Sequence, residues 1–147
     1  MADAWQPRAM PTLALSRVAR MISRLVELRL SPLGIKTAHL PVLVALKDGA
    51  KLTQMELAVI AGVEQPTMAQ LLARMERDGL IRREPSPDNW RSSLVMLTAH
   101  AEALLEPGRE VLRSIDEEVC AGLGAEDRET FLRLLYKIAE GAGEADR

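Results

Sequence analysis

The amino-acid sequence predicts a mainly α-helical fold that carries one small β-hairpin. Apolar residues recur along most of the chain at the three- and four-residue spacing of amphipathic helices. Glycine and proline divide that pattern into separate segments. Between Leu80 and Thr98 the helical spacing gives way to two short apolar-rich runs on either side of a polar stretch. We therefore expect four helices, a hairpin and two further helices, in that order.

The composition limits the class of protein. A chain of 147 residues suits one domain, and 48% apolar but only 3% aromatic residues indicate a core of aliphatic helix packing. No apolar run approaches the roughly 18 residues of a membrane span, and residues 1–10 lack signal-peptide features. We expect a cytoplasmic protein without a membrane partner. The single cysteine, Cys120, is expected to be a small buried apolar residue rather than a redox group.

The first two predicted helices precede residue 51. Residues 12–30 carry apolar side chains at helical spacing with arginines between them, and "SPLG" ends this helix. The pattern of residues 36–49 predicts a second helix that stops at Asp48 and Gly49. Pro41 is compatible with that helix only if it begins close by, because proline is tolerated in a first turn.

The next two helices are short and are separated by a glycine. Thr53 and Glu56 have the spacing of a capping box, which predicts a helix beginning at Thr53 and closing at Gly62. A further helix opens with Pro66 in its first turn and stops before Gly79. The inward faces are expected to hold Leu57, Ile60 and Ala61 on the first helix, and Met68, Leu71, Leu72 and Met75 on the second.

The rest of the chain is a hairpin and two long helices. The runs "LIRRE" and "LVMLT" are the predicted strands, with "PSPDNWRSS" at the tip. Helical spacing returns from Ala99 to Leu123, where Pro107 and Gly108 are expected to kink or divide the helix. A last helix is expected from Ala125 to about Glu140.

Two short helices joined by a glycine turn and followed by a hairpin are the parts of a winged helix-turn-helix, whose second helix enters the DNA major groove. Opposite its apolar face, and around Pro66, this helix presents Gln65, Thr67, Gln70 and Arg74. Glutamine fits an adenine edge and arginine a guanine edge, each giving roughly 1–3 kcal/mol of discrimination. The alternative is an ordinary amphipathic helix with a solvated polar face. The capping box, glycine turn and hairpin together favour DNA binding.

The net charge of −2 argues mildly against a nucleic-acid partner, but its distribution does not. Residues 1–50 carry seven basic and three acidic residues, whereas residues 102–147 carry six basic and twelve acidic ones. Salt screens charges beyond about 8–10 Å, so an acidic tail that stands away from the phosphates is compatible with DNA binding.

The run "TQMELAVIAGVEQPTMAQLLARMERDGLIRREPSPDNWRSSLVMLT", residues 53–98, resembles the core of the MarR (multiple-antibiotic-resistance repressor) family. The family pattern is T-Q-x-E-L-A, G-V, P-T-M, L-x-R-M/L-E-x-D-G-L-I/V, P-x-D-R-R-S and V-x-L-T. The resemblance implies one MarR-type domain over residues 1–147, with a DNA-binding lobe at about 36–98 and a helical dimerisation region at about 11–31 and 99–141. It also implies a homodimer on a pseudo-palindromic operator in double-stranded DNA, modulated by a small organic effector. We expect a repressor.

The hairpin tip departs from the family pattern, because Asn89 takes the place of the acid and Trp90 that of the first arginine. In the family the acid steadies the second arginine, which enters the minor groove, and Arg91 keeps that position. Trp90 either lies along the sugar-phosphate edge or folds back on the lobe. The predicted wing contacts are Trp90, Arg91 and Ser92, and Gln54 is a predicted contact that positions the DNA backbone.

The terminal helices carry apolar stripes at residues 13–30 and 131–138 that exceed what one small lobe can cover. A partner chain explains them economically, since symmetric dimers are the commonest assembly. The alternative is intrachain core, and both explanations can hold for different residues.

The effector site is expected near Met21, His39 and Leu43, because the resemblance implies a pocket between the dimerisation helices and the lobe. A lone helical histidine is more often a structural group than a ligand contact. With two histidines and no Cys/His cluster, the sequence predicts neither a metal site nor a cofactor.

The sequence offers little for an enzyme. Two histidines, one cysteine and one tyrosine leave few groups for acid–base or nucleophilic chemistry, and no phosphate loop or dinucleotide glycine pattern is present. An all-helical adaptor that binds only protein is the remaining alternative. We interpret the chain as a sequence-specific DNA-binding transcriptional regulator without catalytic residues.

Overall fold

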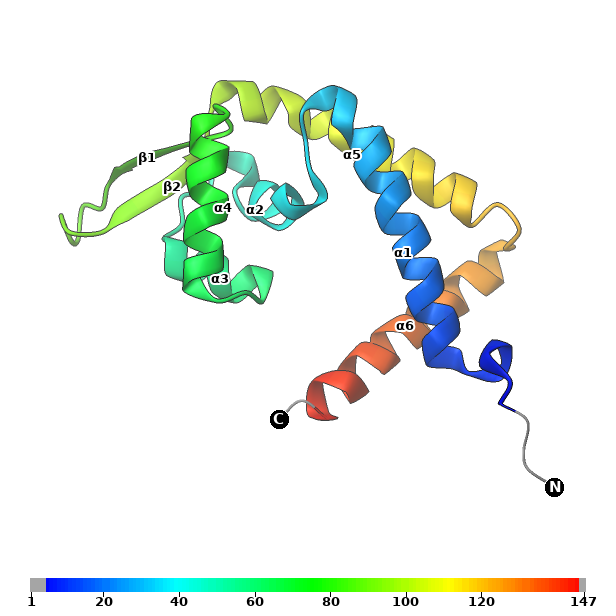
Figure 1. Ribbon diagram of the computed structural model, residues 1–147. Coiled ribbons are helices and arrows are strands. Elements are labelled where there is room, and N and C mark those ends of the chain that lie inside the picture. Colours follow the sequence, from blue (N-terminus) through cyan, green and yellow to red (C-terminus); the bar gives the residue numbers. More distant parts are fainter. Residues whose placement is uncertain (1–4, 146–147) are drawn as a thin grey trace. The chain divides into compact units, whose positions relative to one another are not determined.

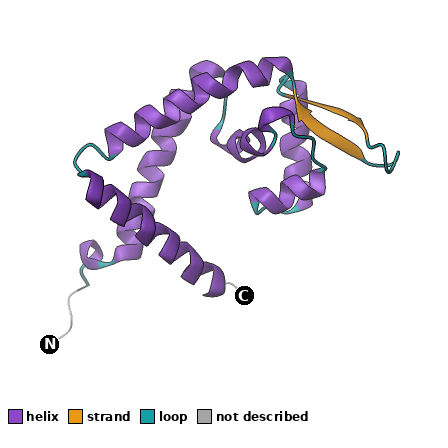
Figure 2. Ribbon diagram, turned by 180° about the vertical axis from the view of Figure 1, so that it is seen from behind, coloured by secondary structure: helices purple, strands orange, loops and turns teal. Residues whose placement is uncertain are grey.

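The computed structural model describes residues 5–145 and consists of helices and one two-stranded sheet (Figures 1 and 2), which confirms the mainly α-helical fold class with a small hairpin. The chain forms two compact units, Met1–Val111 and Leu112–Arg147. The α-helices and strands are α1 (Pro11–Leu30), α2 (Leu40–Ala45), α3 (Gln54–Ala61), α4 (Gln65–Arg77), β1 (Ile81–Pro85), β2 (Ser93–Leu97), α5 (Ala99–Val119) and α6 (Ala125–Ala145). Short 3-10 turns are η1 (Pro7–Ala9), η2 (Ser31–Leu33), η3 (Thr37–His39) and η4 (Lys47–Gly49).

Helix α1 ends where the sequence predicts, through η2 and Gly34, which has a φ of +72°. Only its last turns enter the core of the first unit, at Val26 and Leu30. Ile22 and Leu25 are half-buried, and the apolar residues before them are exposed. Pro41 lies in the first turn of α2, in the position that the sequence requires for it. The first unit therefore begins with a helix that is largely uncovered by its own chain.

The helix-turn-helix is formed by α3 and α4 around Gly62, which has a φ of +67° and ends α3. The Thr53 hydroxyl accepts a hydrogen bond from the Glu56 backbone N–H at 3.2 Å and donates one to the Glu56 carboxylate at 3.1 Å. This pair holds the start of α3, so the predicted cap is present. On α4 the predicted inward residues are buried: Met68, Leu71, Leu72 and Met75.

One predicted core position on α3 is wrong. Ile60 is 56% exposed, whereas Leu57 and Ala58 are buried and Ala61 is half-buried. The inward face runs through residues 57, 58 and 61, where α3 meets α2, α4 and β2. Ile60 projects beyond the edge of that face, because successive helical residues are rotated by about 100°.

The hairpin is antiparallel and pairs Ile81 with Leu97 through Pro85 with Ser93. A third stretch of backbone joins it, since Leu52 and Val95 exchange two hydrogen bonds of 3.1 and 2.7 Å. Residues 86–92 form the tip beyond the paired strands. The hairpin is thus attached to the chain just before α3 as well as to the end of α4.

Helix α5 is one continuous helix that contains Pro107, so of the two expectations, a kink or a division, the division is wrong. A proline removes one i to i−4 hydrogen bond, and the remaining hydrogen bonds of this 21-residue helix keep the helix continuous at Pro107. The following Gly108 is buried, and a Cβ built there would lie 3.3 Å from Ile35 Cδ1. The glycine therefore allows α5 and the segment after α1 to approach closely.

The second unit holds the end of α5 and α6. Ile115 is buried in α5, and Arg128 Nε donates a hydrogen bond to the Cys120 carbonyl at 3.4 Å across the connection. Cys120 itself is half-buried. Helix α6 extends to Ala145, five residues past the predicted end at Glu140. In the part of the chain that the structure describes, no helix is long and apolar enough to cross a membrane.

Candidate nucleic-acid interface

Helix α4 displays its leading turn. All five residues that the sequence singles out on it are exposed or half-exposed at the surface: Gln65, Pro66, Thr67, Gln70 and Arg74. Glu64 precedes the helix but its side chain makes no capping hydrogen bond, and the first turn contains no acidic residue. The backbone N–H groups and the positive end of the helix dipole are therefore free of an acidic side chain from their own first turn. Gln54, the first residue of α3, is half-buried.

The hairpin tip is closed by Asn89. Its Oδ1 accepts the Arg91 backbone N–H at 3.1 Å, and its carbonyl accepts both the N–H and the hydroxyl of Ser92, at 3.0 and 3.2 Å. Residues 90 and 91 project from this turn. Trp90 is 79% exposed, so the tip does not fold its indole back on the lobe. The guanidinium carbon of Arg91 lies 5.1 Å from the centre of the Trp90 ring.

Several basic side chains on the lobe are held in ion pairs, and the predicted DNA contacts are not among them. Four of them pair with carboxylates: Lys51 with Glu84 at 2.6 Å, Arg82 with Glu84 at 3.5 Å, Arg83 with Glu76 at 3.5 Å and Arg77 with Asp78 at 3.8 Å. The hydrogen bond from Lys51 is the main reason that the pKa of Glu84 lies below its ordinary value. Within residues 5–145, Arg74 and Arg91 have no such carboxylate partner. The two cations assigned to DNA contacts are therefore uncompensated.

An acidic side chain that the sequence analysis missed joins α1 to the segment before α2. The Glu27 carboxylate accepts the hydroxyl and the backbone N–H of Thr37 at 2.6 and 2.9 Å, which lowers its pKa. A signal was present, because an acid near a helix C-terminus opposes the dipole and needs a local partner.

Of the three residues predicted near an effector, Met21 is 54% exposed while His39 and Leu43 are each 3% exposed. The His39 Nδ1 accepts the Lys36 backbone N–H at 3.1 Å. Burial is the main cause that lowers the pKa of His39 below 6.5, with Lys36 and Arg74 acting in the same direction and Asp78 and Glu27 opposing. His39 therefore serves as a neutral hydrogen-bond acceptor in the fold.

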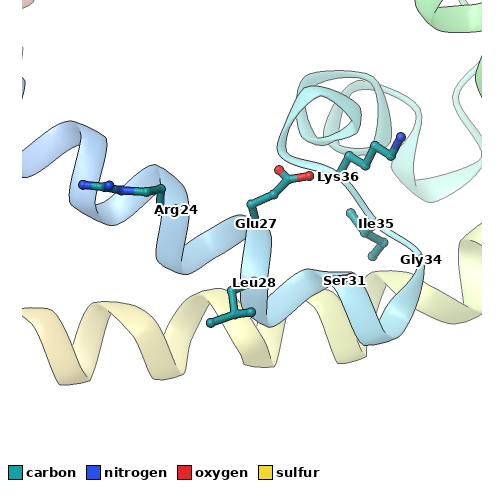
Figure 3. A pocket seen from close by; sticks show the side chains of 7 residues that line it. All are labelled: Arg24, Glu27, Leu28, Ser31, Gly34, Ile35 and Lys36. Carbon is teal, nitrogen blue, oxygen red and sulfur yellow. The ribbon is translucent and has the colours of Figure 1, made fainter.

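A pocket of about 450 Å³ opens beside the end of α1. In Figure 3, Glu27 projects from α1 toward the segment that carries Lys36, and Ile35 comes from the connecting loop. None of Met21, His39 and Leu43 lines this pocket. The lining residues are Arg24, Glu27, Leu28, Ser31, Gly34, Ile35 and Lys36. Among the described residues, no group of three or more His, Cys, Asp or Glu is arranged to hold a metal ion.

The chain is similar in sequence to known regulators. The MarR family pattern matches residues 33–92. The transcriptional regulator HosA of Escherichia coli O111:H- is 37% identical over 94 residues, which are 64% of this chain and 70% of HosA. The chain belongs to the MarR family.

Solved structures of MarR-family proteins share the fold. The repressor CouR bound to a 23-mer DNA duplex matches with a TM-score of 0.81 and 26% identity, over 88% of this chain and 92% of CouR. A cysteine-to-serine mutant of E. coli MarR in complex with operator DNA matches with a TM-score of 0.74 and 29% identity, over 85% of this chain and 93% of that one. The protein is thus a MarR-family transcriptional regulator with a DNA-binding winged helix, and not an enzyme.

Proposed function

We propose that this MarR-family regulator is a homodimeric repressor. Each protomer inserts α4 into a major groove of a pseudo-palindromic operator, and a small organic effector releases the dimer. The observation that carries the proposal is the exposed leading turn of α4, with uncompensated Arg74, on the same lobe as a hairpin tip that displays uncompensated Arg91. Related proteins bound to DNA, CouR and the MarR mutant, support this use of the lobe.

Each predicted contact has a separate role in the proposal. Gln65, Thr67, Gln70 and Arg74 contact bases and phosphates, Pro66 fixes the first turn of α4, and Gln54 contacts the DNA backbone. Arg91 enters the minor groove beside Trp90. The Ser92 hydroxyl already donates to the Asn89 carbonyl, so Ser92 contributes by closing the tip.

A homodimer is supported by apolar side chains that the chain leaves uncovered on two helices. Water-exposed apolar surface of this extent is typical of a subunit interface. A two-fold axis would also provide two α4 helices, which reach successive major grooves when they stand about 34–36 Å apart. The exposed side chains are Leu13, Leu15, Val18, Met21 and Leu28 on α1, and Phe131, Leu132, Leu134, Tyr136 and Ile138 on α6.

The pocket beside α1 is the proposed effector site. Leu28 and Ile35 provide apolar lining and Arg24 and Lys36 provide cations. The Glu27 carboxylate also lines the pocket but already accepts two hydrogen bonds from Thr37, so the lining suits a small organic acid. His39 adjoins it through the hydrogen bond from Lys36, while Met21 and Leu43 stay predicted neighbours. The η3 turn contacts both α1 and α4, so a ligand here can bias the orientation of α4. A 100-fold difference in affinity corresponds to about 2.7 kcal/mol of coupling.

The function is tested by selecting bound duplexes from a random library with the full-length protein. We expect two related half-sites. Arg74→Ala should weaken binding to the selected duplex by about 5- to 150-fold and relax the preference at one position of each half-site. Arg77→Ala, on the same helix, removes a cation already paired with Asp78 and should leave the base preference intact. Undiminished base preference in Arg74→Ala would contradict the assignment of α4.

A further inference from the structure

The hairpin tip presents an aromatic ring and a cation side by side. Trp90 is 79% exposed, and the guanidinium carbon of Arg91 lies over its ring at 5.1 Å. A tryptophan exposed to this degree gains little free energy from burial of apolar surface. The ring is therefore not explained by packing of the lobe, and its contact with Arg91 requires an explanation of its own.

Asn89 orders the backbone of the tip without touching the guanidinium. Its side chain accepts the Arg91 backbone N–H, and its carbonyl accepts two hydrogen bonds from Ser92. In the described part of the chain, no ion pair joins Arg91 to Asp88. The turn thus holds residues 90 and 91 outward, and the charge of Arg91 is left unneutralised.

The choice of a ring over a carboxylate changes what the guanidinium can do. A carboxylate binds the edge N–H groups of arginine and neutralises its charge. An aromatic ring contacts the flat face and leaves the five edge donors free. In the minor groove an A·T pair offers only the acceptors N3 and O2, whereas a G·C pair adds the guanine amino donor. A guanidinium with free edge donors suits A·T pairs.

We propose that Trp90 is a positioning residue for Arg91, and that the pair makes the wing selective for A·T pairs in the minor groove beside each half-site. This inference rests on the DNA binding proposed above. The indole face holds the guanidinium at the tip, and Arg91 enters the groove with its edge donors available.

The contact is tested without DNA. The protein is labelled with 5-fluorotryptophan, and Trp5→Phe assigns the fluorine resonance of Trp90, since the chain has two tryptophans. Arg91→Ala should shift that resonance. Arg82→Ala removes another exposed arginine of the hairpin, which is paired with Glu84. This variant should leave the Trp90 resonance unshifted. A Trp90 resonance unmoved by Arg91→Ala would overturn the proposal whether or not the protein binds DNA.

The positioning role is tested on the duplex selected from the random library. Trp90→Leu should weaken binding about two- to fivefold, the effect of an exposed cation–π pair, and Trp90→Phe should restore most of it. In an Arg91→Ala background, Trp90→Leu should cause no further loss of affinity, because the ring acts through Arg91. Equal losses in both backgrounds would mean that Trp90 contacts the DNA itself, which overturns the positioning role.

Selectivity is tested by changing the duplex beside the half-sites. Replacing A·T pairs by G·C pairs there should weaken DNA binding by the unmodified protein about fivefold or more. Inosine·cytosine pairs, which lack the amino group, should restore binding. The Trp90→Leu variant should lose less affinity when A·T is replaced by G·C. Equal penalties in the two proteins would overturn the selectivity while leaving the DNA-binding function intact. Failure to select any duplex would overturn both, and the fluorine experiment would still report on the contact.

Discussion

At the scale of single residues, the lobe separates cations that stabilise its own structure from cations that remain available. Lys51, Arg82 and Arg83 pair with the carboxylates of Glu84 on β1 and Glu76 on α4. Exposed pairs of this kind contribute little to stability, so their main effect is to reduce local positive charge. Among the described residues of the lobe, Arg74 and Arg91 have no such carboxylate partner, and the same holds for Lys36 and Lys47.

Arg91→Ala should lower the affinity for the selected duplex with little change in major-groove preference. The reason is that a minor-groove cation releases counterions without reading the bases that α4 contacts. We expect the slope of log K against log salt to fall in magnitude by about 1 for each phosphate that the variant no longer neutralises, measured by fluorescence anisotropy between about 50 and 200 mM salt. An unchanged slope would remove the wing from the interface.

The buried His39 predicts a pH dependence of stability. Its pKa in the folded protein is lowered from 6.5, so the unfolded chain binds the proton more readily. Stability is therefore complete above about pH 6.5 and is lost as pH falls toward the folded pKa, by at most about 1.4 kcal/mol per pH unit. His39→Asn keeps an acceptor for the Lys36 N–H and removes the titration. Urea unfolding from about pH 5 to 8 should show a weaker slope in this variant, and identical slopes would contradict the prediction.

At the scale of elements, helix ends marked by a cap or a glycine were predictable, whereas features set by tertiary neighbours were not. Thr53, Gly62 and Gly79 act locally, through a cap and through positive φ angles, so the sequence is sufficient to locate them. The exposure of Ile60 depends on which neighbours surround α3, and the continuity of α5 at Pro107 depends on the rest of that helix. Such tertiary effects are not contained in a local pattern.

Thr53→Ala should destabilise the protein by about 0.5–2 kcal/mol, because the Glu56 N–H is deprived of its side-chain acceptor at the start of α3. Thr53→Ser keeps the hydroxyl and should retain most of the stability. Chemical denaturation followed by circular dichroism measures both. Equal losses of stability in the two variants would show that the methyl group, not the cap, is what matters.

Pro107→Ala should stabilise the protein by roughly 1–3 kcal/mol, since it restores an N–H to the interior of α5 and relieves the ring's crowding of the preceding turn. The matched control is Pro41→Ala. That proline lies in the first turn of α2, where its missing N–H costs little, so no gain is expected. A comparable gain at both positions would refute the explanation.

At the scale of the whole molecule, the exposed apolar faces of α1 and α6 predict the assembly. Phe131→Glu, at a position 44% exposed on α6, should shift a dimer toward monomers in analytical ultracentrifugation, since a charge cannot be buried unpaired at an interface. Val59→Glu, on α3, is the control at a position 78% exposed and should leave the assembly unchanged. A stable dimer of the Phe131 variant would contradict the α6 interface.

Some features of the candidate site could not be predicted from the sequence. Helical spacing was enough to place Gln65, Thr67, Gln70 and Arg74 on the outward side of α4. By contrast, the sequence left two positions open for Trp90, because its contact with Arg91 depends on how the tip closes. The pocket is lined by a helix end and a loop, and its shape depends on the path of the chain after Ser31.

The backbone bridge between Leu52 and Val95 ties the hairpin to the entrance of α3. Thr98, just after β2, adds a second anchor by donating its hydroxyl to the Gly79 carbonyl at 2.6 Å just past α4. With these two anchors, we expect α3, α4 and the paired part of the hairpin to move together as one rigid body. Under the proposed function, an effector that shifts α4 should therefore shift the hairpin with it.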